Sequence, residues 1–175
     1  RVEEKSFLNA ADAPTVDFAE IGSAADITAA LSRIGLPALL KTRREGYDGK
    51  GQAWIRDAAG AEAAFAAVGA TPSVLEAKAA FRRELSIIAA RGRDGEAAFY
   101  PLSENVHEGG VLRTTLAPAE VTPAVRREAE RIARAVLGRL DYVGVMGIEL
   151  FDLGDGGLLV NEIAPRVHNT GHWTQ

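Results

Sequence analysis

The sequence contains no cysteine, one methionine and few aromatic residues, which make up 6% of the chain. The absence of cysteine excludes a disulfide framework and thiolate metal sites, and it fits a reducing compartment, so we expect a cytoplasmic protein. No apolar run approaches about 18 residues and no signal-peptide pattern is present, so we predict no membrane partner. The net charge of −4 provides no overall basic surface, and nucleic acid is therefore not an expected partner.

The remaining composition is that of a globular protein. The 175 residues are 47% hydrophobic and 25% charged, which is enough to form a core without covalent cross-links. The sequence begins at Arg1 without an initiator methionine, and we interpret it as part of a longer protein. A change of pattern near Thr71-Pro72 divides it into a small lobe, residues 1–72, and a larger lobe, residues 73–175. Because clefts between domains are favoured ligand sites, a nucleotide is expected between the lobes.

Local patterns predict helices and strands in the first lobe. Ser23 and Asp26 form a capping-box pattern ahead of an alanine-, leucine- and isoleucine-rich run, so a helix is expected over residues 23–34. A second, alanine-rich helix is expected over residues 58–68. Strands are expected over residues 38–42 and 52–56, with a loop over residues 43–51 between them.

In the second lobe, short β-rich segments separated by glycine-containing turns predict hairpins. Thr122 followed by Pro123 is a helix-start pattern, and apolar residues recur at helical spacing as far as Leu140. The residues from Ala164 to Gln175 are expected to form a polar loop. The expected strands are residues 73–75, 84–91, 97–102, a short one around 105, and 111–114.

Two further segments, Val143–Leu153 and Leu158–Glu162, read as the arms of a hairpin. Pairing Leu153 with Leu158 places Glu149 opposite Glu162, where the two carboxylates would repel each other. A divalent cation between them removes that repulsion, and hard oxygen ligands suit Mg²⁺, with Mn²⁺ as an alternative. The competing interpretation is that one acid points to solvent, but the apolar flanking residues favour burial.

A glycine-rich loop follows the strand that ends near Lys41. Its three glycines, Gly46, Gly49 and Gly51, would let backbone N–H groups approach a phosphate closely, and the Lys41 ammonium could reach the same anion. An ordinary glycine-rich hairpin loop is the alternative. The spacing is not that of a P-loop, because Lys50 is followed by Gly51.

Other polar residues are candidates for nucleotide and anion binding. Glu76 and Glu84 could accept hydrogen bonds from a ribose or an adenine amino group. Arg166 would bind carboxylate or phosphate oxygens through its planar guanidinium. His168 and His172 lack the helical spacing and cysteine partners of a zinc site, so zinc is not expected there.

Three segments, residues 41–52, 99–107 and 161–174, together resemble the N5-carboxyaminoimidazole ribonucleotide synthetase family. These are ATP-grasp enzymes of de novo purine biosynthesis. The resemblance covers essentially the whole chain and implies an α+β ATP-grasp fold, with two lobes of antiparallel sheets and helices and a nucleotide cleft between them. The family's amino-terminal and carboxy-terminal domains are expected to be absent from this chain.

The resemblance implies that ATP phosphorylates bicarbonate to carboxyphosphate, which carboxylates the exocyclic amine of aminoimidazole ribonucleotide, and that the full-length enzyme is a homodimer. It implies that Glu149 and Glu162 hold Mg²⁺ and that Tyr47 and Asp48 touch the ribonucleotide. The implied catalytic residues are Arg166, His168 and Asn169. The implied ATP-binding residues are Arg1, Lys41, Gly46, Tyr47, Asp48, Gly49, Lys50, Gly51, Gln52, Glu76, Ala77, Lys78, Ala79, Glu84, His107, Asn161 and Glu162.

Two other functions remain open at this point. Another ATP-grasp ligase, such as a formate-dependent ribonucleotide transformylase or a biotin carboxylase, would share the fold and the metal acids, but the run from Arg166 to Trp173 favours the carboxyaminoimidazole family. A non-catalytic ATP-binding module would need neither Arg166 nor two metal carboxylates, so their presence argues against it.

Overall fold

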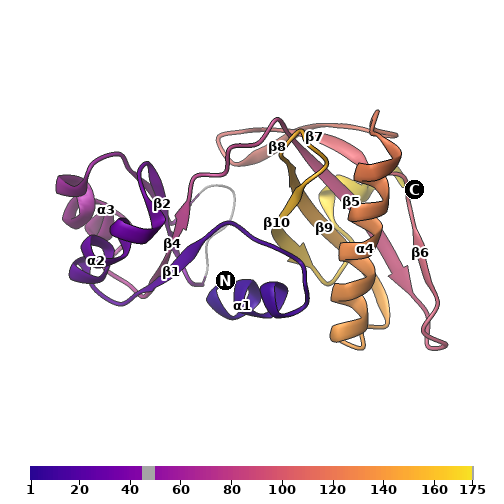
Figure 1. Cartoon of the computed structure of the whole chain (residues 1–175), viewed down its shortest axis with the longest axis horizontal. Helices are drawn as coiled ribbons and strands as arrows, with labels where there is room; N and C mark the ends of the chain where they lie inside the picture. The colour runs from indigo at the N-terminus through magenta and orange to yellow at the C-terminus, as the bar shows by residue number, and fades with distance from the viewer. Residues whose placement is uncertain (45–49, 175) are drawn as a thin grey trace. The chain divides into compact units, whose positions relative to one another are not determined.

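A computed structural model describes residues 1–44 and 50–174 of the chain. The chain forms two compact units (Figure 1). The first unit comprises Arg1–Lys5 and Val16–Ala79, and the second comprises Ser6–Thr15 and Ala80–Gln175. Helix α1 (Val2–Ala10), which the sequence patterns did not predict, therefore contributes residues to both units. Among the described residues, no helix has the length and apolarity that a membrane crossing requires.

The first unit is built on a four-stranded antiparallel sheet with the order β1-β4-β2-β3. Its strands are β1 (Phe18–Ile21), β2 (Ala38–Thr42), β3 (Gln52–Ile55) and β4 (Ser73–Ala77). Its helices are α2 (Ala24–Ile34), the short 3₁₀ helix η1 (Ala58–Gly60) and α3 (Ala61–Ala67). Buried side chains such as Ile27 of α2, Leu40 of β2 and Leu75 of β4 form one core, so α2 and α3 cover one face of this sheet.

Capping explains where the helices of the first unit begin. The Ser23 hydroxyl accepts from the Asp26 backbone N–H, and the Asp26 carboxylate accepts from the Ser23 N–H at 2.8 Å, so the expected capping box is confirmed. The single helix expected over residues 58–68 is instead divided into η1 and α3. Asp57 caps η1 by accepting from the Gly60 N–H at 3.0 Å.

The second unit is built on a six-stranded antiparallel sheet with the order β10-β9-β5-β7-β8, in which β6 also pairs with β5. Its first strands are β5 (Arg83–Arg91), β6 (Ala97–Phe99), β7 (Ser103–Glu108) and β8 (Val111–Leu116). Helix α4 (Pro123–Arg139) follows, and the chain continues through β9 (Gly144–Asp152), β10 (Leu158–Ala164) and the 3₁₀ helix η2 (Asn169–Thr174). The polar loop expected over residues 164–175 therefore contains η2, in which the Thr174 hydroxyl donates to the Gly171 carbonyl at 2.8 Å.

Helix α4 covers one face of this sheet (Figure 1). It begins at the expected Thr122-Pro123 pair, and the Thr122 hydroxyl accepts from the Val125 N–H at 3.3 Å. Its apolar stripe packs with fully buried residues of the sheet, including Ile87 of β5 and Ile148 of β9. Because side chains alternate along a strand, the residues between these apolar ones project from the other face. That other face carries the polar residues of the candidate site.

The β9–β10 hairpin differs from the expected register at its turn. Leu158 pairs with Asp152, not with Leu153 as the sequence analysis assumed. The Leu153 N–H donates instead to the Gly157 carbonyl at 3.0 Å, within the turn. A β-bulge between Val160 and Glu162 then shifts the register, so that Glu162 pairs with Glu149. The expected pairing of Glu149 with Glu162 is therefore confirmed, although the pairing of Leu153 with Leu158 from which it was predicted is wrong.

The boundary between the two units lies after β4, whereas the sequence analysis placed it between residues 72 and 73. Strand β4 belongs to the first unit because it pairs with both β1 and β2. Residues 6–15 join the second unit, where the Pro14 carbonyl accepts from the Val160 N–H at 2.7 Å. Neither the pairing of β4 with β1 and β2 nor the hydrogen bond between Val160 and Pro14 has a local signal in the sequence.

Candidate functional site

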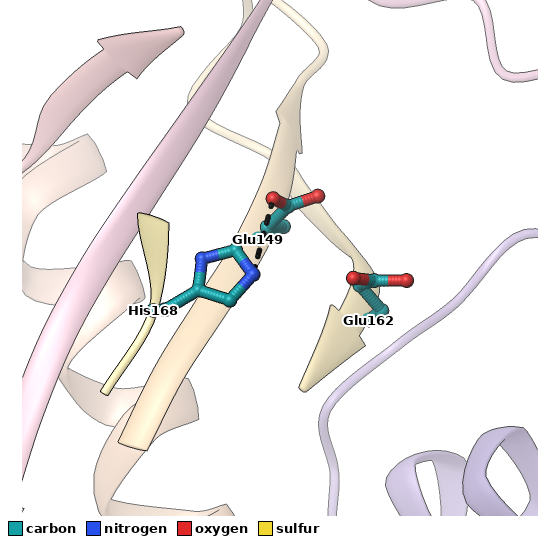
Figure 2. A group of neighbouring side chains, drawn as sticks. All are labelled: Glu149, Glu162 and His168. Atoms are coloured by element: carbon teal, nitrogen blue, oxygen red, sulfur yellow. Dashed lines mark ion pairs between the residues drawn. The ribbon is translucent and has the colours of Figure 1, made fainter. Parts of the chain in front are cut away.

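Two acidic side chains and one imidazole meet on the face of the second sheet that α4 does not cover. Glu149 lies in β9, Glu162 pairs with it from β10, and His168 follows β10. One ligand atom from each residue lies within 4.8 Å of the other two, and Figure 2 shows this group. Nε2 of His168 is 3.9 Å from Oε1 of Glu149, the pair marked by the dashed line. Three potential metal ligands thus converge from two strands and the segment after them.

The backbone around His168 fixes the orientation of its ring. Nδ1 of His168 forms a hydrogen bond of 2.9 Å with the Thr170 hydroxyl, which leaves Nε2 to face Glu149. A Cβ atom on Gly147 of β9 would lie 2.7 Å from Cβ of His168, so only glycine leaves room for the ring there. Burial lowers the pKa of His168 and outweighs the opposing charge of Glu162. The imidazole is therefore favoured in its neutral form, which can ligate a metal.

A second imidazole lies on another side of Glu149. Nδ1 of His107, on β7, pairs with Oε2 of Glu84 on β5, and its Nε2 is 4.0 Å from Oε1 of Glu149. The amide of Asn161 donates to the other oxygen, Oε2 of Glu149, at 3.2 Å. The structure therefore brings together Glu84, His107, Asn161 and Glu162, four of the residues that the sequence analysis assigned to ATP.

The carboxylate pair has an electrostatic cost in the absence of a cation. Burial and then the charge of Glu162 raise the pKa of Glu149 to about 7, while His107 and the Asn161 hydrogen bond oppose the shift. A divalent cation bound by both carboxylates would offset these two causes. Paired carboxylate oxygens suit Mg²⁺ or Mn²⁺. His172 is not among the three residues of this group.

Two other predicted residues meet in the first unit. The ammonium of Lys41, at the end of β2, donates to Oε2 of Glu76 on β4 at 2.8 Å. Lys5 of α1 forms a second ion pair, with its Nζ 3.3 Å from Oε1 of Glu76. Burial raises the pKa of Glu76, but the charges of Lys41 and Lys5 outweigh it and the net shift is downward. Sequence reasoning missed Lys5, because a lone lysine in a helix gives no local signal that it is buried.

The remaining predicted ATP residues are spread along the first unit. Arg1 immediately precedes α1, and Ala77 ends β4 with Lys78 and Ala79 after it. Gly51 has φ +68°, and a Cβ there would lie 2.8 Å from the Thr42 hydroxyl, so this position requires glycine. Lys50 precedes Gly51, and Gln52 begins β3. Gly46, Tyr47, Asp48 and Gly49 lie outside the described residues.

The proposed anion-binding residues follow β10. Arg166 is exposed, and its guanidinium donates to the Val167 carbonyl at 2.8 Å. Asn169 begins η2, and its side-chain oxygen accepts from the Thr170 N–H at 3.0 Å. Both residues flank the buried His168, so the three predicted catalytic residues come from one short segment.

Comparisons with known proteins agree on the family. Residues 6–175 match the ATP-grasp domain family. The chain is 50% identical over 171 residues to a Pseudomonas aeruginosa protein named N5-carboxyaminoimidazole ribonucleotide synthase, covering 98% of this chain and 47% of that one. The chain is also 47% identical to N5-carboxyaminoimidazole ribonucleotide synthetase from Thermus thermophilus, whose crystal structure matches it with a TM-score of 0.92. That match covers 99% of this chain and 47% of the Thermus thermophilus chain.

An Aspergillus clavatus synthase, solved in complex with ADP and 5-aminoimidazole ribonucleotide, is 29% identical with a TM-score of 0.88. That match covers 98% of this chain and 45% of the fungal chain. The chain thus spans about half the length of the relatives that it matches. The observed sheets and helices are those of the expected α+β ATP-grasp fold. The chain belongs to the ATP-grasp family.

Proposed function

We propose that the protein carrying this chain uses ATP and bicarbonate to carboxylate 5-aminoimidazole ribonucleotide, producing N5-carboxyaminoimidazole ribonucleotide, ADP and phosphate. The observation that carries the proposal is the Glu149, Glu162 and His168 group, in a chain 50% identical to a protein named for this activity. The Aspergillus clavatus relative, which binds ADP and the same ribonucleotide, supports the substrate assignment. A cytoplasmic location and a homodimer, both expected above, complete the proposal.

The reaction proceeds in two transfers. An oxygen of bicarbonate attacks the γ-phosphorus of ATP, and the bond to the ADP oxygen breaks to give carboxyphosphate. The exocyclic amine of the ribonucleotide then attacks the carboxyl carbon, the phosphate leaves with the C–O electron pair, and the amine loses one proton. Such chemistry needs positioning and charge stabilisation more than a covalent intermediate on the protein.

The residues of the second unit divide this work. Glu149 and Glu162 would hold Mg²⁺, which when bound neutralises phosphate charge. Arg166 is exposed after β10 and would bind the carboxyphosphate oxygens bidentately. His168, whose ring is fixed by Thr170 and favoured as neutral, would position the anion together with Asn169. His107 and Asn161 lie beside Glu149, and Glu84 pairs with His107, so the three would orient Glu149 toward the nucleotide.

Other predicted ATP-binding residues belong to the first unit. Lys41 would contact a phosphate, and Glu76 to Ala79 would hold the ribose and adenine. The segment from Gly46 to Gln52 would cover the phosphates with its backbone N–H groups, and Tyr47 with Asp48 would contact the ribonucleotide.

The test measures ADP release by the full-length protein with Mg²⁺ and ATP, with and without ¹³C-bicarbonate and aminoimidazole ribonucleotide. We expect ADP release to require both substrates and one ¹³C label to enter the ribonucleotide for each ADP formed. Turnover that requires formate instead of bicarbonate would contradict the proposal and indicate another ATP-grasp ligase. ATP binding without turnover of any tested acid would also contradict it and indicate a nucleotide-binding module.

A further inference from the structure

A buried cluster of three charges in the first unit contains one more positive charge than negative charge. Glu76 lies between Lys5 and Lys41, and the side chains of Lys5, Glu76 and Lys41 are only 5%, 5% and 15% exposed. Lys41 and Glu76 alternate with the core residues Leu40 and Leu75, so they project from the sheet face opposite α2 and α3. Lys5 reaches the same carboxylate from α1.

The two lysines hold Glu76 differently. Lys41 makes an aligned hydrogen bond of 2.8 Å to one carboxylate oxygen. Nζ of Lys5 lies 3.3 Å from the other oxygen, and neither atom has an aligned hydrogen bond among the residues that the structure describes. Burial lowers the pKa of Lys5, and the charge of Lys41 lowers it further, against the opposing charges of Glu76 and Glu4. The ammonium of Lys5 is thus held in place mainly by the charge of Glu76.

An excess of one buried ammonium is costly unless an anion offsets it. Lys41 retains three times the side-chain exposure of Lys5, 15% against 5%, and it lies near the end of β2, where a phosphate is proposed to bind. Of the two lysines, Lys41 is therefore the one that can turn to an incoming anion. Glu76 would then lose one of its two buried counter-charges, and Lys5 would be the one that remains.

We propose that Lys5 is a positioning residue for ATP binding: it neutralises Glu76 so that the Lys41 ammonium can leave this carboxylate for a nucleotide phosphate. The inference rests on the ATP binding within the proposed function and not on the carboxylation step. Without Lys5, Glu76 would have Lys41 as its single buried counter-charge, and ATP would have to break that pair.

The test compares Lys5→Met, which removes the charge at similar volume, with Lys5→Arg in the full-length protein. Calorimetry with Mg²⁺-ATP should show about tenfold weaker binding for Lys5→Met, the scale of one charge-assisted hydrogen bond, and at most about a twofold change for Lys5→Arg. If turnover is present, KM for ATP should rise in Lys5→Met while kcat stays within about twofold. Arg56→Met removes an exposed charge from the same unit and should leave ATP binding unchanged.

The decisive measurement is a double-mutant cycle with Glu76→Gln. In the Glu76→Gln background Lys41 is already released, so adding Lys5→Met should change ATP affinity by no more than about twofold. An equal loss of affinity in both backgrounds would overturn the proposal, because Lys5 would then act directly on ATP or through the fold. Unchanged ATP binding in Lys5→Met would overturn it as well.

Two safeguards keep the result interpretable. If Lys5→Met does not fold, Lys5→Gln takes its place, because its amide can still donate to Glu76 while carrying no charge, and the same tenfold loss is expected. Because calorimetry measures ATP binding without turnover, a failure of the proposed carboxylation leaves this test intact.

Discussion

Glu162 pairs with Glu149 across the β9–β10 ladder, and the bulge between Val160 and Glu162 places Asn161 against the same carboxylate. In a bulge, two residues of one strand oppose one residue of the other, so Glu149 faces both Asn161 and Glu162. The donated hydrogen bond holds one oxygen of Glu149, while the other lies toward the two histidines. The bulge therefore builds the candidate metal site without a helix or a cysteine.

The carboxylate pair should be necessary for metal-dependent turnover. Glu162→Gln keeps the side-chain shape but removes one ligand charge, so we expect Mg²⁺-dependent ADP formation to fall by about 10²-fold or more. The measurement is ADP formation across a Mg²⁺ titration of the full-length protein. Glu120→Gln, an exposed acid of the same unit, serves as the control and should retain full activity. Near-normal turnover in Glu162→Gln would show that the pair does not hold the metal.

The raised pKa of Glu149 predicts a pH-dependent stability in metal-free protein. Between pH 4.5 and about 7 the unfolded carboxyl ionises before the folded one, so the free energy of unfolding falls as pH rises. The loss is on the order of 3 kcal/mol by about pH 8. Urea unfolding in EDTA from about pH 5 to about pH 8 should show a steeper decline for the parent than for Glu149→Gln, and added Mg²⁺ should reduce the difference. Parallel curves for the two proteins would contradict the assigned pKa.

The hydrogen bond from Asn161 should lower the pKa of the Glu149 carboxylate and so favour metal binding. This hydrogen bond opposes the upward shift of the Glu149 pKa, so Asn161→Ala should raise that pKa further and weaken Mg²⁺ binding. We expect a several-fold increase in the Mg²⁺ concentration for half-maximal activity, larger at about pH 6.5 than at about pH 8.5, because protons compete with the metal. An increase that is independent of pH would argue that Asn161 acts only by shaping the bulge.

Two glycines of the second unit provide a matched test of how His168 is held. A Cβ at Gly147 would lie 2.7 Å from Cβ of His168, so Gly147→Ala should displace the ring and reduce turnover about tenfold or more. Among the described residues, a Cβ added to Gly138 of α4 would meet no other side chain or neighbouring element within 4 Å, so Gly138→Ala should leave turnover unchanged and stabilise the helix by about 0.5–1 kcal/mol. Steady-state kinetics and thermal unfolding of both variants test this prediction. Equal turnover in the two variants would show that the absence of a side chain at Gly147 is not needed to hold the His168 ring.

Arg166 should separate ATP binding from carboxylation. Arg166→Lys keeps the charge but loses the planar fork, so product formation should fall by about 10²-fold while ATP affinity changes little. The measurements are ¹³C incorporation into the ribonucleotide and calorimetry with ATP. The exposed Arg126→Lys of α4 is the control and should match the parent. Lost ATP binding with intact carboxylation per bound ATP would assign Arg166 to the nucleotide instead.

Local signals in the sequence determined where several helices and strands of this protein form. The capping box at Ser23, the Thr122-Pro123 helix start and the apolar pattern of β9 each depend on near neighbours, and the structure confirms these elements. The motif around Arg166 and His168 likewise indicated an ATP-grasp enzyme, and residues 6–175 match the ATP-grasp domain family. Helix α1 and strand β1 were missed, because each is short and neither carries a strong pattern.

Only the tertiary structure decided the features that depend on distant residues. The bulge at Asn161 sets the register of Glu162, and a hydrophobic pattern with a period of two residues cannot reveal an inserted residue. The burial of Lys5 beside Glu76 follows from contacts between α1 and β4, which are far apart in sequence. The same holds for His107, which reaches Glu84 and Glu149 from a third strand. Charges acquire their roles here from burial and from their partners, and both are set by packing rather than by local sequence.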